Sequence, residues 1–345
     1  MSIAEIDHIW NADWSNRKNL TFIVCGSAAS WMIKKLLDDK GGLHNRITHR
    51  MLIAPWLPKD IQSFFKTRGV SWRARTVMDY NLILGGIPYY LEYLNPKKSI
   101  AENIDELFFS NKDNLSSEFD RLFSSLFSDS KDHVKIVKVL GAHAYGLTRD
   151  DLLKKTRLSS GGWIHDKLVE LEAAGFIIGF IPYGHKKKQK TFRLTDEFCG
   201  FYLRWIGDEG SRKIQVKRGQ SIFQSAERYQ WMGIQFENFI LKNSQAVIDA
   251  IKINNIVSWA GPYRDDQGQI DLLIDRSDGC MSLIEIKYTE QPLVWTSEME
   301  KSLQKKVFEF ENKFKKQIIP CLLSFAGIKG KTSAHLIASD KVLGI

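Results

Sequence analysis

Two neighbouring runs in the last third of the chain have the hydrophobic pattern of paired β-strands. Residues 270–276 and 280–287 are mostly apolar, and Ser277-Asp278-Gly279 lies between them. Glycine at the third place of such a loop suits the left-handed conformation that closes a three-residue hairpin. In that hairpin Leu272 faces Ile284, so apolar side chains meet across the two strands. The pattern therefore predicts both the hairpin and its register.

Helical and strand patterns follow on both sides of this hairpin. Residues 228–243 and 297–316 have the spacing of amphipathic helices, and residues 255–261 and 317–325 have the composition of strands. The order along the chain is then helix, three strands, helix and strand. We expect one domain of this α-β-β-β-α-β type over residues 206–345.

The middle of the chain predicts three helices and a hairpin. Apolar residues recur at helical spacing in residues 131–144, Thr148 precedes a second helical run, and a third run ends at Gly175. Two β-rich runs follow, and the basic segment 184–190 joins them. This order is typical of a winged helix-turn-helix, which we expect over residues 126–205.

The N-terminal third predicts part of an α/β sheet followed by helices. Residues 20–26 form an apolar strand-like run, a second such run lies near residues 51–56, and Gly85-Gly86 precede a helix that Pro88 opens. The polar segments 116–132 and 207–213 are the expected boundaries between regions. The sequence thus predicts a multidomain α/β and α+β protein divided into residues 1–125, 126–205 and 206–345.

Charge and composition point to a polyanionic partner. The formal net charge is +9, which favours DNA, although a solvated basic surface is the alternative. The longest apolar run contains Pro320 and is shorter than the roughly 20 residues of a membrane helix. The N-terminus has no apolar secretory core, and no cysteines are spaced for zinc. We expect a cytoplasmic protein without a membrane segment.

The predicted hairpin places charged side chains together on one face of a sheet. Asp271 faces Glu285 in this register, and Lys287 shares their face because strand side chains alternate. Two opposed carboxylates repel each other, and Mg²⁺ between them would relieve the repulsion. Lys287 would then orient a water or stabilise charge on a phosphate. The alternative is a salt-bridged surface, which contributes little stability.

These residues resemble the PD-(D/E)XK nuclease superfamily. The matching motifs are Ile270-Asp271 and Glu285-Ile286-Lys287, with isoleucine where the superfamily pattern has proline. The resemblance implies a restriction-endonuclease-like domain, metal ligands Asp271 and Glu285, and catalytic Lys287. Glu237 matches the extra acid on the first helix of many members. Its alternative is an ordinary exposed helix glutamate.

The whole chain resembles a prokaryotic (archaeal-type) family of AAA+-type ATPases that carry a winged helix and a nuclease-like domain. The resemblance implies a sensor role for Ser27, a trans-acting arginine at Arg46 or Arg50, and a helical lid that includes Gly86. No P-loop precedes these residues, and Gly330-Lys331-Thr332 lacks its first glycine. We therefore expect the Walker motifs upstream of Met1, in a truncated relative. ATP would bind only with an upstream or partner P-loop domain, in a homo-oligomer or with a partner ATPase.

The basic tip of the middle hairpin supplies the candidate DNA contacts. They are Lys186, Lys187, Lys188 and Lys190. The third helix carries a mixed set on its expected exposed face, namely His165, Asp166, Lys167 and Glu170. Two functions stay open: an Mg²⁺-dependent hydrolase that cuts phosphodiesters, and a non-catalytic DNA- or protein-binding regulator.

Overall fold

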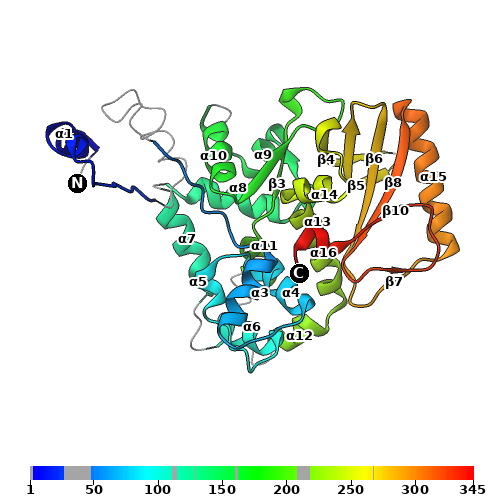
Figure 1. Ribbon diagram of the computed structural model, residues 1–345, viewed down its shortest axis with the longest axis horizontal. Helices are drawn as coiled ribbons and strands as arrows, with labels where there is room; N and C mark the ends of the chain where they lie inside the picture. The colour runs from blue at the N-terminus through cyan, green and yellow to red at the C-terminus, as the bar shows by residue number, and fades with distance from the viewer. Residues whose placement is uncertain are drawn as a thin grey trace.

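The computed structural model describes residues 3–26, 48–110, 115–127, 129–159, 162–207, 218–266 and 268–345. The fold is mixed α/β, with helices gathered on one side and a twisted sheet on the other (Figure 1). The described residues form a five-stranded, a three-stranded and a two-stranded sheet. The predicted mixed α/β class with several sheets is confirmed. No helix among the described ranges is long and apolar enough to cross a bilayer.

The five-stranded sheet is the frame of the C-terminal region. Its strands are β4 (Val257–Asp265), β5 (Gly268–Arg276), β6 (Cys280–Lys287), β8 (Gln317–Ser324) and β10 (His335–Ile337). Their order is β10-β8-β6-β5-β4, antiparallel from β4 to β6 and parallel from β6 to β10. Leu272 pairs with Ile284, and Gly279 has φ +84°, so the predicted hairpin is confirmed, and its predicted register holds from Leu272 to Asp275.

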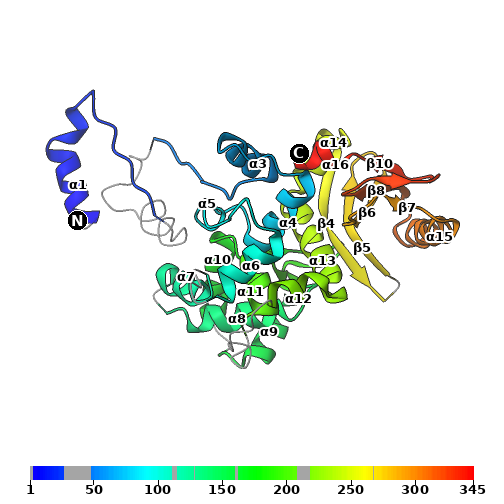
Figure 2. The same ribbon diagram turned by 90° about the horizontal axis from the view of Figure 1, so that it is seen from below.

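Helices cover both faces of this sheet. Helix α15 (Ser297–Phe314) connects β6 to β8 across one face, and α13 (Ala226–Lys242) lies on the other (Figure 2). Two separate apolar cores result, because alternate strand residues point to opposite faces. Leu272 and Ile284 belong to the core on the side of α13, and Leu273 and Leu283 pack with Phe310 of α15. Along the chain, α13, β4, β5, β6, α15 and β8 follow the order of helices and strands predicted from the sequence.

Short elements complete the C-terminal region. They are α12 (Arg218–Gln224), α14 (Ser244–Ala250), the 3₁₀ turn η5 (Asn254–Ile256), the paired strands β7 (Leu293–Val294) and β9 (Ile328–Lys329), and α16 (Ser339–Leu343). Gly330 follows β9 in a loop, where Thr332 Oγ1 donates to Glu300 at 2.9 Å. This Gly-Lys-Thr segment thus forms a contact between the loop and α15.

The middle region has the predicted order of three helices and a hairpin. Its elements are α8 (Lys131–Gly141), β1 (Leu147–Thr148), α9 (Arg149–Thr156), α10 (Gly162–Ala173), β2 (Ile177–Phe180), the 3₁₀ turn η3 (Lys187–Gln189), β3 (Thr191–Leu194) and α11 (Glu197–Trp205). The three strands form an antiparallel sheet in the order β1-β3-β2. Thr148 caps α9, as predicted, by accepting the amide of Asp151 at 3.2 Å.

All the regular elements described in the N-terminal third are helices. It contains α1 (Ile3–Ala12), the 3₁₀ turn η1 (Trp14–Asn16), α3 (Pro58–Thr67), α4 (Ala74–Leu84), α5 (Pro88–Leu91), α6 (Ile100–Phe108) and α7 (Glu118–Leu126). The strands expected within residues 20–26 and 51–56 are wrong. Both segments are outside any sheet, and Ile23 and Leu52 are 80% and 84% exposed. A strand forms only where a neighbour accepts and donates its backbone hydrogen bonds, and no described strand lies beside these runs.

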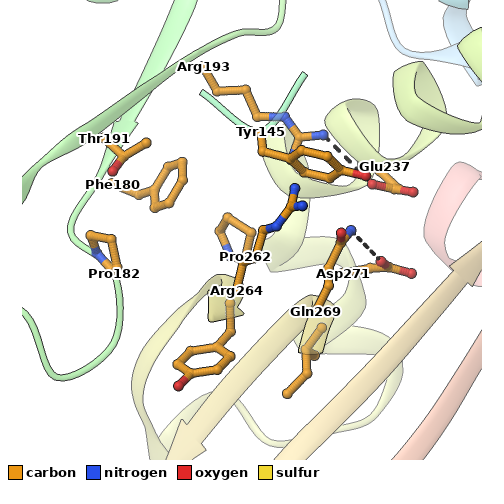
Figure 3. A pocket seen from close by; sticks show the side chains of 12 residues that line it. Tyr145, Phe180, Pro182, Thr191, Arg193, Glu237, Pro262, Arg264, Gln269 and Asp271 are labelled. Atoms are coloured by element: carbon orange, nitrogen blue, oxygen red, sulfur yellow. Dashed lines mark hydrogen bonds and ion pairs between the residues drawn. The ribbon is translucent and has the colours of Figure 1, made fainter. Parts of the chain in front are cut away.

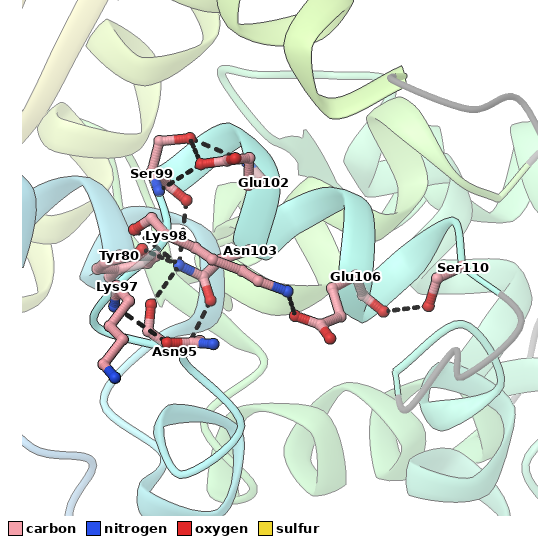
Figure 4. Close-up of polar contacts among 9 residues, drawn as sticks. All are labelled: Tyr80, Asn95, Lys97, Lys98, Ser99, Glu102, Asn103, Glu106 and Ser110. Carbon is pink, nitrogen blue, oxygen red and sulfur yellow. Dashed lines mark hydrogen bonds and ion pairs between the residues drawn. The ribbon is translucent and has the colours of Figure 1, made fainter.

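A buried amide fixes the turn between α5 and α6 (Figure 4). Asn103 Oδ1 accepts the backbone amide of Asn95 at 2.7 Å, and its Nδ2 donates to the Tyr80 hydroxyl at 2.9 Å and to the carbonyls of Asn95, Lys98 and Ser99. Ser99 caps α6 through Glu102. The buried Asn103 side chain thus satisfies backbone polar atoms on the inner side of this turn.

Segment 116–132, which the sequence suggested as a boundary, contains a packed helix. Phe119 and Phe123 of α7 are fully buried, and they stack on Tyr202 at 4.6 Å and Phe176 at 4.8 Å between ring centroids. Polar residues on the outer face of α7 conceal this apolar stripe in the sequence. One apolar core therefore runs from the N-terminal helices into the middle region. The second suggested boundary lies mostly outside the described residues.

Candidate active site

Asp271 lies where strand β5 departs from regular pairing. Ile270 packs in the same core as Leu273, although regular alternation would place them on opposite faces. The register between β4 and β5 also shifts between Gly261 and Tyr263. Regular pairing of β5 with β6 ends at Leu272. This irregularity is a β-bulge, a feature that redirects side chains at functional sites.

The carboxylate of Asp271 takes part in the backbone bonding at this point. Its Oδ2 accepts the amide of Ile286 at 2.8 Å, and its Oδ1 accepts Nε2 of Gln269 at 3.3 Å. The sequence predicted that Asp271 would face Glu285 directly in the ladder. Instead the ladder stops one residue earlier, and the side chain supplies the acceptor for the next amide. These bonds fix the orientation of the carboxylate.

Glu285 and Lys287 meet Asp271 on the same side of the sheet. The ammonium of Lys287 lies 3.2 Å from Glu285 Oε2 and 3.6 Å from Asp271 Oδ2. The carboxyl side chains of Asp271 and Glu285 are only 8% and 13% exposed. The structure therefore brings together the three residues that the sequence singled out. Their chemical roles stay a prediction.

A second lysine completes the cluster. Lys306 of α15 forms an ion pair with Glu285 Oε1 and donates to the carbonyl of Gln269 at 2.9 Å. Sequence reasoning marked residues 297–316 as a basic helix but did not select this residue. The sequence does not distinguish the lysines of this helix from one another, because only the packing of the helix on the sheet decides which of them reaches Glu285.

Glu237 approaches the cluster from α13. Its side chain is 18% exposed, and its Oε2 lies 3.7 Å from Nη2 of Arg193. An exposed helix glutamate, the alternative considered from the sequence, is therefore excluded. Burial and the negative charge of Asp271 raise the pKa of Glu237 to about 7. This carboxyl group can exchange a proton near neutral pH.

The environment gives the two strand carboxylates different acidities. Burial raises the pKa of Asp271, and Lys287 only partly offsets the effect. Burial also acts to raise the pKa of Glu285, but the charges of Lys287 and Lys306 outweigh it and lower that pKa. Burial opposes the charge of Lys287, yet the carboxylates of Asp271 and Glu285 raise its pKa. Lys287 therefore stays protonated at neutral pH.

The carboxylates of the cluster suit a divalent ion that takes few ligands from the protein. Among the described residues, no group of three or more His, Cys, Asp or Glu side chains is placed to hold a metal. Mg²⁺ in phosphoryl-transfer sites uses one or two carboxylates, with waters and substrate oxygens as the other ligands. Asp271 and Glu285 meet this smaller requirement. A bound ion would compete with Lys306 for Glu285.

A cavity of about 130 Å³ adjoins Asp271 and Glu237 (Figure 3). One wall belongs to the middle region and the other to β4, β5 and α13. The cavity is lined by Tyr145, Phe180, Pro182, Thr191, Arg193, Glu237, Pro262, Tyr263, Arg264, Gln269, Ile270 and Asp271. These residues are far apart in the sequence, so no local pattern could have indicated the cavity.

The hairpin of the middle region is attached to the five-stranded sheet. The Tyr183 hydroxyl donates to Asp275 Oδ2 at 3.1 Å, and Trp259 Nε1 donates to the carbonyl of Ile181 at 3.1 Å. The ring of Tyr183 also packs against Trp259 and Phe314. These contacts hold one wall of the cavity against the other.

The lysines predicted to bind DNA fall into two groups. Lys186, Lys187 and Lys188 are exposed at the hairpin tip. Lys190 is half-buried, and its ammonium lies 2.7 Å from Glu172. Its charge is thus already paired within the protein.

Helix α10 has fewer charged side chains on its surface than the sequence suggested. His165 and Asp166 are exposed, as expected. Lys167 is buried instead, with its ammonium 3.5 Å from the half-buried Glu170, which also bonds His133. The helix period was correct, but Lys167 and Glu170 face the packed side.

The structure describes only some of the residues that the family resemblance links with nucleotide chemistry. Ser27 and Arg46 lie outside the described residues, and Arg50 is exposed. Gly86 accepts the Trp56 amide at 2.7 Å and lies in the turn before α5.

Comparisons with protein-family models, with curated proteins and with solved structures found no match.

Proposed function

We propose that this protein is a metal-dependent hydrolase of phosphodiester bonds in DNA. The observation that supports it best is the convergence of Asp271, Glu285 and Lys287, in which one ammonium lies within 3.6 Å of two buried carboxylates. Carboxylates that hold Mg²⁺ and an amine that meets the phosphate are the groups this reaction needs. The site also opens on a cavity with further cations.

The roles of the side chains follow from their environments. Asp271 and Glu285 would hold Mg²⁺, which would supply Lewis acidity at the phosphate and an activated water. Lys287 keeps its proton because its pKa is raised, so it acts as a fixed positive charge that orients and stabilises the phosphate. Glu237, with a pKa of about 7, is placed to take up or release a proton.

The wider architecture supports two resemblances as part of this proposal. The order α13, β4, β5, β6, α15 and β8 agrees with a PD-(D/E)XK nuclease-like domain. The three helices and hairpin of residues 131–194 agree with a winged helix, whose exposed Lys186, Lys187 and Lys188 would contact DNA phosphates. We infer membership of the AAA+-type ATPase family with this arrangement. ATP would act through an upstream or partner P-loop domain.

A second function is favoured by the charge balance of the cluster. Glu285 is paired with both Lys287 and Lys306, so the carboxylates are already compensated without a metal ion. A charge-balanced cluster of this kind can be a structural feature that turns over no substrate. The second proposal is therefore a non-catalytic DNA- or protein-binding regulator.

Cleavage assays distinguish these functions. Plasmid and single-stranded DNA are incubated with wild type, Asp271→Asn and Lys287→Met, in Mg²⁺ or in EDTA. We expect Mg²⁺-dependent cutting that falls about 10²- to 10³-fold in either variant, as expected when a key charged group is lost. Asp278→Asn is the matched control, because Asp278 belongs to the same hairpin and pairs with Arg276 at its turn.

Two outcomes would reject hydrolysis. Equal cutting by wild type and both variants would point to a contaminating nuclease. Salt-dependent DNA binding without any cutting, unchanged in Asp271→Asn, would favour the regulator.

A further inference from the structure

Arg193 is buried beside the cavity with unsatisfied donors. It belongs to β3, its side chain is 3% exposed, and its Nε and Nη2 have no hydrogen-bond partner among the described residues. Burying a donor without an acceptor is destabilising, and more so when the donor is charged. Native structures rarely keep such a group without a reason. The side chain lines the cavity next to Asp271 and Glu237.

The nearest carboxylate does not satisfy this guanidinium. Glu237 Oε2 lies 3.7 Å from Nη2, which is an ion-pair distance but too long for a hydrogen bond. The raised pKa of Glu237, about 7, weakens the pairing further, because this carboxyl group is partly protonated near neutral pH. The fork of N–H groups on Arg193 therefore has room for another acceptor.

A second arginine faces the same space. The guanidinium of Arg264 lies 4.0 Å from the ring centroid of Tyr145, and that of Arg193 lies 5.9 Å from it (Figure 3). Arg264 is exposed, so it stands at the mouth of the cavity while Arg193 lies at its inner wall. Arginine is the side chain best suited to planar, two-pronged contact with phosphate oxygens.

Charge and size also suit an anion. The cavity and the adjoining cluster contain the cations Arg193, Arg264, Lys287 and Lys306 and the carboxylates of Glu237, Asp271 and Glu285. The cations exceed the carboxylates by one, and more when Glu237 is protonated. A cavity volume of about 130 Å³ is well above the roughly 10–15 Å³ that holds one water, so it leaves room for a larger polar group.

We propose that this cavity is a subsite for one phosphate group of the substrate, bound by Arg193 and, at the mouth, by Arg264. The inference rests on the proposed function, because the adjacent phosphodiester would then reach Asp271 and Lys287. The phosphate is either a terminal one on a DNA strand or an internal one next to the bond that is cut. Both sources offer the same oxygens to the guanidinium.

Binding measurements in EDTA test the subsite without hydrolysis. The affinities of inorganic phosphate and of a single-stranded oligonucleotide, with a 5′-phosphate or a 5′-hydroxyl, are measured by calorimetry. We expect Arg193→Gln to weaken binding about ten- to hundredfold, as for the loss of charged hydrogen bonds. Arg264→Gln, at an exposed position, should weaken it less. Glu237→Gln should strengthen it, because it removes a competing negative charge.

Arg204→Gln is the matched control, since Arg204 is exposed and pairs with Glu227 at 2.9 Å. Thermal unfolding of each variant checks that it is folded. If Arg193→Gln does not fold, the opposite changes expected in Arg264→Gln and Glu237→Gln still test the proposal. A purely structural Arg193–Glu237 pair would not give tighter phosphate binding in Glu237→Gln.

The oligonucleotide arms identify the source of the phosphate. An Arg193-dependent preference for the 5′-phosphate assigns the cavity to a strand end. Equal affinities that both depend on Arg193 assign it to an internal phosphodiester. Phosphate and oligonucleotide affinities that none of the three variants changes, or no saturable binding to wild type, would overturn the subsite. Arg193-dependent binding without any cleavage would reject hydrolysis and leave the subsite standing.

Discussion

Glu237 shows how one buried carboxyl group can link stability to pH. It lies between Arg193 and the Asp271 cluster, and its pKa is raised from the usual 4.5 to about 7. The folded state then holds this proton more tightly than the unfolded chain does. The resulting stability is complete below about pH 4.5 and is lost as the pH rises through about 7.

Glu237→Gln should remove this loss. We expect the free energy of unfolding of the variant, relative to wild type, to rise by roughly 1–3 kcal/mol between pH 5 and pH 8. Urea unfolding at the two pH values measures the difference. Glu227→Gln on the same helix is the control and should show little change, because its side chain is 63% exposed. A difference for Glu237→Gln that does not vary with pH would contradict the assignment.

Only part of the candidate site could be predicted from the sequence. Asp271, Glu285 and Lys287 were found because a hairpin loop fixes which strand residues share a face. The bulge at Asp271 was missed, since it depends on the pairing of β5 with β4. Arg193 and Lys306 were missed because they belong to other elements, β3 and α15. The hydrophobic period of an element does not indicate where that element packs.

Among the elements, the hydrophobic period was reliable where each element had a partner in the fold. It was correct for the β5–β6 hairpin and for the order of elements in the middle region. It was wrong at residues 20–26 and 51–56, because apolar residues indicate a preference for burial and not the presence of a neighbouring strand. It also overlooked α7, whose buried Phe119 and Phe123 lie among serines and acids.

Helix α7 should contribute strongly to stability. Phe123→Ala is expected to lower the free energy of unfolding by about 3–5 kcal/mol, because it leaves a cavity against Phe176. Ser124→Ala, at the neighbouring exposed position, should change it by less than about 0.5 kcal/mol. Urea denaturation measures both. Equal effects would mean that the segment acts as a linker.

The turn before α5 has a steric requirement for glycine. A Cβ at Gly86 would lie 1.9 Å from the carbonyl oxygen of Trp56, so we expect Gly86→Ala to be strongly destabilising, by more than about 3 kcal/mol. Gly233 on α13 has open space around it, and Gly233→Ala should be neutral or stabilising by up to about 1 kcal/mol. Melting temperatures of the two variants measure this contrast. A stable Gly86→Ala protein would show that the turn can move.

In the whole molecule, hydrogen bonds and apolar contacts join the three predicted regions. The Tyr288 hydroxyl donates to Asp79 at 2.7 Å, and Arg75 donates to the carbonyl of Thr289 at 2.9 Å. These bonds join α4 to the chain directly after Lys287. One apolar core includes residues from Ile61 to Leu343. The proposed divisions near 125 and 205 therefore cross a packed interior.

This continuity predicts one cooperative unfolding transition. Far-ultraviolet and near-ultraviolet circular dichroism should give superimposable urea curves. Arg75→Ala should move the midpoint of both to lower urea, because it breaks the contact between α4 and Thr289. Lys59→Ala, at an exposed position on the neighbouring α3, is the control. Two separate transitions would instead support domains that fold on their own.

Because Tyr183 and Trp259 tie the hairpin of the middle region to the sheet, the cavity exists only when two distant stretches of chain have met. Such long-range encounters are slow steps in folding. A nascent or partly assembled molecule would thus carry its strand carboxylates before it could recognise a phosphate. The ability to bind the proposed phosphate group would therefore arise at the last step of folding.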